Sequence, residues 1–429
     1  MKASQTPAAA ESEPFFAGHK TYVLFICFLV YTFNYIDRQI LIILAEPIKN
    51  EFGLSDSQLG FLTGTAFALF YATLGIPIAH LADRLNRVNI IAISLSIWSA
   101  MTALCAITNN FAQLAAARVG VGIGEAGGSP PASSLLSSYF SVKQRSTAMG
   151  IYALGPTVGL LLGFIVGGWV NELFGWRVAL LVVGIPGLLL ALVLKLTVRE
   201  PKRETIAGSD SQQNVPLFKE TLKTLFAITS FRWVNAGATI TGFSVYGFMV
   251  WTPIYLIRQF ELSTGEVGTA IGLVAGIAGS IGIFGGGFLA DALSKRNIRW
   301  QMRIPAITTL IFFPLILVFL NASSAKMAII LLIPAYTVAL AYTGPTWAAL
   351  QSVSPPHMRA MAAAIMLFLV NLIGLGMGPQ LIGIVSDILS ETIGSGALRY
   401  AIGFSGTLTL LASLCYFQAS RFLPGDIQD

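Results

Sequence analysis

The chain has 429 residues, of which 55% are hydrophobic and only 11% are charged, and its net charge at pH 7 is +6. Its mean hydropathy is +0.74. One water-soluble core cannot bury that much apolar surface, so the composition excludes a soluble enzyme and indicates a protein surrounded by lipid. The basic residues lie in short loops between apolar runs, which indicates membrane orientation and not nucleic-acid binding.

Twelve apolar runs follow one another along the chain, each long enough to cross a bilayer. The first six predicted helices cover residues 20–48, 57–82, 88–109, 111–139, 144–170 and 176–198. After a polar linker, the last six cover residues 229–259, 265–290, 301–321, 326–352, 358–388 and 397–422. We therefore predict an all-α membrane protein with two six-helix bundles, 20–198 and 229–422, a linker at 199–228, and tails at 1–19 and 423–429.

The loop charges predict how the chain is oriented. Of the 26 Lys and Arg residues, 19 lie on the side of the termini, 5 lie on the other side and 2 lie inside helices. Positively charged loops stay in the cytoplasm, so both termini are predicted to be cytoplasmic.

The first apolar run is too long for a cleaved signal and is expected to remain as a helix. Cys27, Cys105 and Cys415 show no paired spacing, so neither a disulfide nor a metal site is predicted.

The two halves of the sequence also repeat one another. Three matched pairs stand 208, 214 and 223 residues apart, namely Asp83 with Asp291, Arg145 with Arg359, and Pro156 with Pro379. Internal duplication with Gly/Pro-interrupted helices is typical of alternating-access carriers, whose substrate site lies near the midplane between two bundles.

Two of these motifs resemble a known family. The loop Asp83-Arg84-x-x-Arg87 is similar to the signature of the major facilitator superfamily between helices 2 and 3, although Ala79 and Asn86 stand where glycine is usual. The Gly155-Pro156 helix resembles the antiporter motif of the same superfamily. The resemblance implies two pseudo-symmetric six-helix bundles.

A narrower resemblance is to the spinster lipid transporters. It depends on Asn34-Tyr35-Ile36-Asp37-Arg38 in the first helix and on Arg118 with Gly124-Glu125-Ala126 in the fourth. Eukaryotic members of that group export lysolipids, so the resemblance implies a lipid-like substrate. The short linker and tails resemble a bacterial member, which implies the inner membrane.

The resemblance also implies a charged latch that closes the cytoplasmic side. Its candidate residues are Asp83, Arg84, Arg87, Arg145, Asp291 and Arg359. Arg145 and Arg359 are candidate partners of the two loop acids. Simple anchoring by positive charge would explain the arginines equally well, but not the repeated acids.

Four charges lie well inside predicted helices, namely Asp37, Arg38, Arg118 and Glu125. Each costs about 2.5 to 3.5 kcal/mol in a bilayer, so we predict that they form the proton and substrate site. We expect Asp37 to pair with Arg118, and Arg38 with Glu125. Arginine keeps its proton, so the expected proton carrier is one of the two acids. The alternative is a salt-bridge network that only fixes helix packing.

The second half offers aromatic and hydroxyl groups at the matching depth. The candidate cavity residues are Asn34, Tyr35 and Tyr152 in the first half, and Tyr246, Trp251, Tyr342, Thr343, Trp347 and Gln351 in the second. A cavity charged on one wall and aromatic on the other suits an amphiphile with a charged head and an apolar tail.

We therefore expect a monomeric secondary transporter of a lysolipid-like or sphingolipid-like substrate, without a cofactor and coupled to protons, with sodium as the alternative ion. A carrier of small polar organic anions or drugs and a non-transporting lipid sensor are the alternatives. The sequence has no P-loop, GxSxG or HExxH motif, which argues against ATP hydrolysis and hydrolase chemistry.

Overall fold

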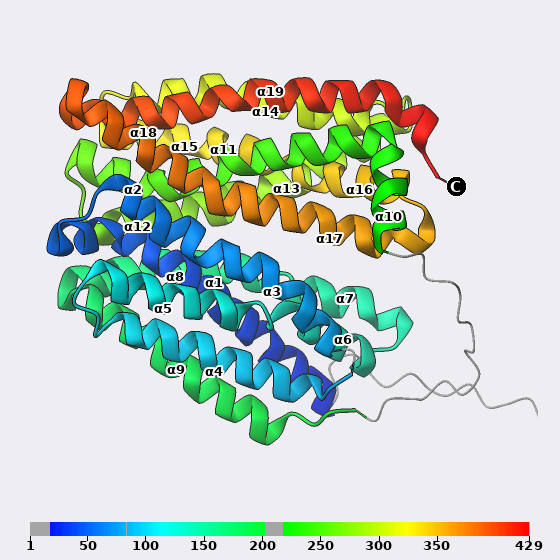
Figure 1. Ribbon diagram of the computed structural model, residues 1–429, viewed down its shortest axis with the longest axis horizontal. Helices are drawn as coiled ribbons and strands as arrows, with labels where there is room; N and C mark the ends of the chain where they lie inside the picture. Colours follow the sequence, from blue (N-terminus) through cyan, green and yellow to red (C-terminus); the bar gives the residue numbers. More distant parts are fainter. Residues whose placement is uncertain (1–17, 83, 202–217, 429) are drawn as a thin grey trace, which may run out of the picture.

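The computed structural model describes residues 18–82, 84–201 and 218–428, and these residues are helical almost throughout, with no strand among them. A bilayer core offers no water to backbone amides, so a spanning segment must pair its amides internally, as a helix does. Figure 1 shows the long helices lying side by side along one axis, with the second half of the chain above the first.

The first half of the chain forms six membrane helices. In chain order they are α1 (Gly18–Phe52), α2 (Asp56–Gly60) continuing through η1 (Phe61–Thr65) into α3 (Ala66–Ala82), α4 (Arg87–Cys105), α5 (Phe111–Glu125) with α6 (Ser129–Tyr139), α7 (Val142–Tyr152) with α8 (Gly155–Phe174), and α9 (Trp176–Thr197).

The second half repeats this order after a short helix, α10 (Phe218–Ala227), which lies inside the predicted linker. Its six membrane helices are α11 (Thr229–Phe260), α12 (Thr264–Leu273) through η2 (Val274–Ala278) into α13 (Gly279–Ser294), α14 (Trp300–Leu320), α15 (Ala325–Leu340) with α16 (Thr343–Val353), α17 (Arg359–Leu369) through η4 (Val370–Met377) into α18 (Gly378–Ile393), and α19 (Ala397–Asp426). The short turns η3 (Pro356–Met358) and η5 (Gly394–Gly396) flank the fifth of these helices.

The predicted all-α fold with twelve membrane helices is confirmed. By length and hydropathy alone, nine segments of the described chain could cross a membrane. The longest of them, Pro356–Asp426, contains two helices that run in opposite directions, separated by η5. The helices formed by α2 to α3 and by α5 to α6 complete the twelve.

The interruptions in these helices follow the duplication of the sequence. They fall in the second, fourth and fifth membrane helix of each half. Pro156 in α8 and Pro379 in α18 stand in the first turn of the segment after the break, where proline's missing amide hydrogen costs least. Both prolines therefore stand directly after observed helix breaks.

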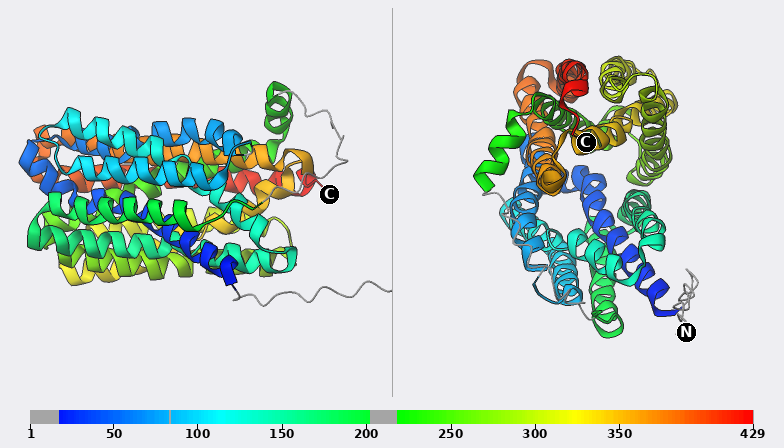
Figure 2. Two further views of the ribbon diagram at one scale, coloured as in Figure 1. Left: turned by 90° about the horizontal axis from the view of Figure 1, so that it is seen from below. Right: turned by 90° about the vertical axis from the view of Figure 1, so that its right-hand side faces the viewer.

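The described chain begins and ends at the same end of the molecule, which we call the terminal end, and the opposite end is the far end (Figure 2). One hydrophobic core near the far end joins residues of both halves, such as Ile43, Phe164, Trp251 and Ile271. Toward the terminal end the core divides into two, one within each half. The halves are therefore packed together at the far end and separate toward the terminal end.

Candidate functional site

The four intramembrane charges come from two helices of the first half. Asp37 and Arg38 lie on α1, and Arg118 and Glu125 lie on α5. The exposed fractions of Asp37, Arg118 and Glu125 are 0%, 3% and 1%. Arg38 donates from Nε to Oε2 of Glu125 across 2.6 Å. The structure therefore contains the expected cross-helix pair of Arg38 with Glu125.

The other expected pair is not formed in this conformation. Within the described chain, no ion pair joins Asp37 to Arg118, and neither carboxylate oxygen of Asp37 has a hydrogen-bond partner. The indole N–H of Trp98 and the hydroxyl of Thr102, both on α4, are polar groups near Asp37, although neither meets its carboxyl in hydrogen-bond geometry. The Arg118 guanidinium instead lies over the ring of Phe67, 5.5 Å from its centroid. Asp37 is thus a fully buried carboxyl group with Thr102, Trp98 and the charge of Arg118 near it, but with no hydrogen bond or ion pair to any of them.

A cavity of about 340 Å³ lies between the two halves. Arg38 and Arg118 reach its wall, whereas Asp37 and Glu125 do not line it. The opposite wall comes from the second half and carries Tyr246, Tyr342, Thr343, Thr346, Trp347 and Asn371. Arg38 also lies over the ring of Tyr71, 4.4 Å from its centroid, which steadies the charge beside the cavity. One wall is cationic and the other is aromatic with hydroxyl groups.

Five of the nine candidate cavity residues line this space, namely Tyr35, Tyr246, Tyr342, Thr343 and Trp347. The other four lie elsewhere in this conformation. Asn34 is buried in α1. Tyr152 stacks on Tyr31 with centroids 4.6 Å apart. Trp251 donates from Nε1 to the carbonyl of Pro379 at 2.8 Å, and the carbonyl of Gln351 accepts from Arg359 at 3.1 Å.

Two amides in the cavity wall were absent from the sequence prediction. Gln39 lies one turn after Tyr35, so its place on the same face of α1 could have been inferred from helical spacing. Asn371 interrupts a long apolar run, which was the available signal. Thr63 and Ser280 also line the cavity, but isolated hydroxyl groups carry no such signal in apolar helices.

The loop residues of the terminal end form contacts within their own halves. Arg87 donates from Nε to Glu200 at 2.7 Å and from Nη1 to the hydroxyl of Ser138 at 2.7 Å. Arg145 donates to the carbonyl of Ser137 at 2.9 Å. Glu200 was not anticipated as a partner, although it stands just after the sixth helix.

Among the remaining latch candidates that the structure describes, Asp291 and Arg359 do not form the expected pair. Arg359 bonds to the backbone at Gln351 and not to Asp291, and Asp291 is exposed, as is Arg84. Asp83 lies outside the described residues. These positions agree with the separation of the two cores toward the terminal end.

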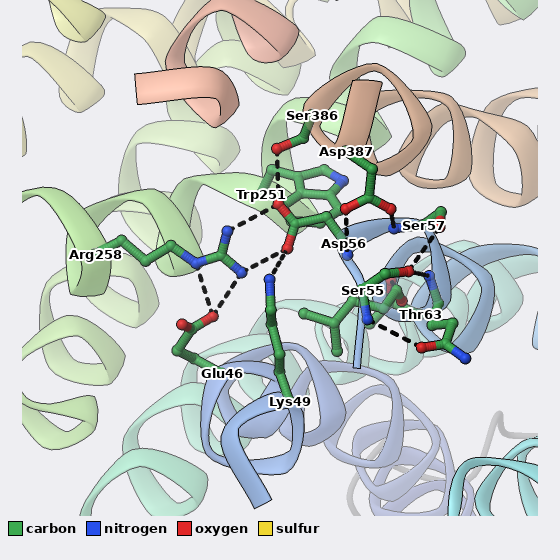
Figure 3. A network of polar contacts seen from close by, with 12 residues as sticks. Glu46, Lys49, Ser55, Asp56, Ser57, Thr63, Trp251, Arg258, Ser386 and Asp387 are labelled. Atoms are coloured by element: carbon green, nitrogen blue, oxygen red, sulfur yellow. Dashed lines mark hydrogen bonds and ion pairs between the residues drawn. The ribbon is translucent and has the colours of Figure 1, made fainter. Parts of the chain in front are cut away.

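The far end holds a charged network between the halves, which Figure 3 shows. Arg258 on α11 donates to both carboxylate oxygens of Asp56, at 2.9 and 2.8 Å, and to Glu46 at 2.9 Å. Lys49 also pairs with Asp56. The hydroxyl of Ser386 on α18 donates to the same carboxylate at 2.7 Å. This network was not predicted, because sequence alone shows only separate charges near helix ends.

Asp387 and close glycine contacts complete the closure of the far end. The Asp387 carboxylate on α18 accepts the backbone N–H groups of Asp56 and Ser57, at 2.9 and 2.8 Å, and so caps α2 from the other half. A side chain at Gly383 would place its Cβ 2.3 Å from the carbonyl of Asp56. Only glycine permits that approach.

Asp56 is the first residue of α2, directly after the loop that connects the first two membrane helices. Burial raises its pKa, but the hydrogen bonds and charge of Arg258, together with the hydrogen bonds of Lys49 and Ser386, lower it more, to about 2 from the ordinary value of 3.8. Asp56 is therefore ionised at physiological pH, and the far-end network keeps its charges.

The sequence profile of the Major Facilitator Superfamily matches residues 27–379. The chain belongs to the Major Facilitator Superfamily. This member is 32% identical over 93% of its length to an MFS-type efflux pump of Mycolicibacterium smegmatis, of which it covers 92%. It is 25% identical over 96% of its length to the hexuronate transporter of Bacillus subtilis, of which it covers 97%.

A solved structure of a similar transporter matches almost the whole chain. It is the crystal structure of a bacterial homolog to the human lysosomal transporter Spinster in an inward-facing and unoccupied conformation, with a TM-score of 0.87 and 31% sequence identity. The match covers 97% of this chain and 99% of that chain. The expected resemblance to the spinster group is confirmed. This Major Facilitator Superfamily protein is therefore a multi-pass membrane transporter and not an enzyme.

Proposed function

We propose that this protein is a proton-coupled transporter of an amphiphile with an anionic or zwitterionic head and an apolar tail, such as a lysolipid, and that it works by alternating access. The observation that supports this proposal is the cavity between the halves. Two arginines reach one wall, and aromatic rings with hydroxyl groups form the other. Such a cavity matches a charged head on one side and an apolar body on the other.

The two arginines differ in how free they are to bind the head. Guanidinium groups suit phosphate and carboxylate because they donate two parallel hydrogen bonds. Arg118 forms no ion pair with a described residue, so its charge is available. Arg38 is held by Glu125. Protonation of Glu125 would release Arg38, which links proton binding to head binding.

Asp37 is the second candidate proton carrier. A charged carboxylate without hydrogen bonds is costly in a dry interior, so a proton on Asp37 removes a charge that no hydrogen bond from a described residue stabilises. Arg38 and Arg118 line the cavity, whereas Asp37 and Glu125 do not, and Glu125 contacts Arg38 from outside it. Protons and substrate would therefore act on the same charges from opposite sides.

The orientation follows from the loop charges. The terminal end carries 19 of the 26 basic residues, so we place it in the cytoplasm of a bacterial inner membrane. The far end, closed by the Arg258 network, then faces outward, and the conformation is inward-facing. The similar spinster homolog was solved in an inward-facing conformation as well. We expect the protein to act as a monomer.

Flux in proteoliposomes tests the proposal. Uptake of radiolabelled lysophosphatidylglycerol is measured with and without an imposed pH gradient, and a protonophore that collapses the gradient serves as the control. We expect uptake that the gradient accelerates and the protonophore abolishes. Uptake that ignores the gradient would refute proton coupling, and absence of lysolipid flux would refute the substrate class.

The second candidate function is transport of a small polar anion. It is supported by the likeness to a hexuronate transporter and by the two cavity arginines, which would bind a sugar acid equally well. Uptake of labelled glucuronate in the same vesicles separates the candidates. Uptake of glucuronate without uptake of lysolipid would favour the small polar anion, and the reverse would favour the amphiphile.

A further inference from the structure

Two neighbouring helices of the second half, α14 and α19, lie at the edge of the molecule opposite the first half (Figures 1 and 2). They run in opposite directions. Near the far end, a Cβ on Gly403 of α19 would meet the Leu320 side chain of α14 at 3.6 Å. Further along, the hydroxyl of Ser413 donates to the carbonyl of Ala306 at 2.7 Å. The start of α14 and the end of α19 therefore meet at the terminal end.

Each of these helices presents an apolar stripe outward. The exposed apolar residues are Ile307, Leu310, Ile311, Leu317 and Val318 on α14, and Phe404, Leu411, Leu414 and Phe417 on α19. Their spacing is mostly three or four residues, which puts each set on one helix face. Because both helices span the membrane, the two stripes contact the acyl chains of the bilayer.

Each stripe ends in an arginine at the terminal end. Arg303 stands one turn before Ile307, and its guanidinium carbon lies 5.5 Å from the ring centroid of Trp300. Arg421 stands one turn after Phe417, and its guanidinium carbon lies 4.9 Å from that ring centroid. An aromatic ring of the same helix therefore holds each guanidinium in place at the level of the lipid headgroups.

Neither guanidinium has an anionic partner. Within the described chain, Arg303 and Arg421 form no ion pair and no side-chain hydrogen bond, and Nε of Arg303 is buried without an acceptor. α14 contains no acidic residue. The one acid of α19, Asp426, accepts the backbone N–H of Ser230 at 2.8 Å. A buried donor of a charged group without an acceptor is costly, so this position calls for an anion.

The register of the two helices places the arginines close enough to share one anion. Arg303 is three residues from Ala306, about 4.5 Å toward the terminal end, and Arg421 is eight residues from Ser413, about 12 Å in the same direction. Long arginine side chains can converge across such a difference in depth. The exposed Arg299, one turn before Arg303, lies near the depth of Arg421 and adds a third positive charge.

We propose that this face binds one anionic phospholipid of the leaflet around the terminal end. The phosphodiester lies between Arg303 and Arg421, and the acyl chains lie along the two apolar stripes. Guanidinium groups bind phosphate through paired hydrogen bonds, and basic pockets between membrane helices suit anionic headgroups. Anchoring by positive charge alone would need neither the ring under each arginine nor the buried donor. The face lies outside the central cavity, so the inference is independent of the proposed function.

Lipid titration of the full-length protein tests this site. Protein freed of lipid in a non-ionic detergent is titrated with dioleoyl phosphatidylglycerol, and bound lipid is counted by native mass spectrometry. Phosphatidylcholine with the same chains tests the headgroup, and glycerol phosphate tests the headgroup without chains. We expect wild-type protein to bind one phosphatidylglycerol at least about tenfold more tightly than phosphatidylcholine. Glycerol phosphate at the same concentration should not displace it.

Single substitutions locate the lipid. Arg303→Gln and Arg421→Gln should each weaken phosphatidylglycerol about fivefold and leave phosphatidylcholine unchanged, since each removes one charge near the headgroup. Arg303→Lys keeps the charge without the paired hydrogen bonds, so its affinity should be intermediate. If Arg303→Gln does not give a monodisperse protein, Arg303→Lys serves in its place.

Two further arginines provide the controls. Arg232→Gln removes an exposed charge of α11 near the terminal end, where Arg232 bonds only to Thr229 of its own helix. Arg118→Gln removes a charge from the central cavity. Neither should change the affinity for phosphatidylglycerol.

Four results would overturn the proposal. Equal affinity for the two lipids would mean that the face does not recognise the headgroup. Equal weakening by Arg232→Gln would mean that only net charge matters. Weakening by Arg118→Gln and not by Arg303→Gln would place the lipid in the central cavity. Displacement by glycerol phosphate would identify a phosphate site that does not need a lipid.

Discussion

Arg38 on α1 and Glu125 on α5 are joined across 2.6 Å, with the arginine in the cavity wall and the glutamate buried behind it. The pair therefore connects the cavity wall to an acid that lies outside the cavity. Any change in the charge of Glu125 alters what Arg38 can bind. This relationship underlies the first two predictions.

Glu125→Gln should uncouple transport from the proton gradient. The amide keeps the shape of the side chain but cannot ionise, so Arg38 loses its charged partner permanently. We expect gradient-driven lysolipid uptake to fall at least about tenfold, while exchange across the membrane without a gradient persists. The control is Glu51→Gln, because Glu51 pairs with Arg177 at the far end, away from the cavity. Equal loss in both variants would contradict the role of Glu125.

The two buried acids should differ in their effect on stability. Glu125→Gln removes the partner of Arg38, so we expect a loss of about 1 to 3 kcal/mol in the free energy of unfolding. Asp37→Asn removes a carboxylate that has no hydrogen bond in the described chain, so stability should be unchanged or higher. Thermal unfolding in detergent at neutral pH measures both. A larger loss for Asp37→Asn than for Glu125→Gln would show that Asp37 has a stabilising partner.

Removing Arg258 should open the far end. Arg258→Ala breaks the bonds to Asp56 and Glu46 that join α11 to the first half, and each bond to a charged group contributes about 1.5 to 3 kcal/mol. Gln380 on α18 donates to the carbonyl of Ser57 on α2 at 3.0 Å, so it lies at the closed seam. A thiol reagent added from that side should then label a cysteine placed at Gln380 at least about tenfold faster. The natural cysteines are buried and should not react with the reagent.

Arg177→Ala is the matched control, because Arg177 pairs with Glu51 within the first half. The exchange of Asp56 and Arg258 for one another should partly restore the wild-type labelling rate. If Arg258→Ala labels no faster than Arg177→Ala, the network does not hold the far end closed.

The far-end closure should not respond to pH over the physiological range. The pKa of Asp56 is lowered from 3.8 to about 2, so the stability that its charge contributes is fully present above 3.8 and is lost as pH falls through about 2. Labelling of the cysteine at Gln380, corrected for reagent reactivity, should therefore be flat between pH 8 and pH 5. A rise within that range would mean that another group of the network titrates.

A methyl group at Gly383 should disfavour the closed far end. Gly383→Ala would place a Cβ 2.3 Å from the carbonyl of Asp56, so α2 and α18 must move apart, at a cost of about 1 to 3 kcal/mol. Gly150→Ala is the control, since its Cβ meets nothing within 4 Å. Faster labelling at Gln380 in Gly383→Ala alone is expected. No difference between the variants would show that the seam tolerates the added volume.

Helical spacing alone could predict only some of the residues in the cavity wall. Tyr246 lines the cavity, while Trp251, five residues on, is buried against Pro379 on another face of α11. The sequence could not separate them, because a helix that is apolar on every side has no pattern to mark which face meets its neighbours. Gln39 was recoverable because a polar group recurs one turn after Tyr35.

From sequence alone, hydropathy, the repeated motifs and the scarcity of charge predicted twelve helices, two related halves and the superfamily. This was possible because each segment in lipid must pair its own backbone amides, so it must be helical. Buried charges are costly in lipid, so the few that occur in the helices stand out in the sequence. Only the tertiary structure decided that Arg258 meets Asp56 and Glu46 and that Asp387 caps α2. Such contacts join residues up to 331 positions apart, and they exist only in the packed conformation.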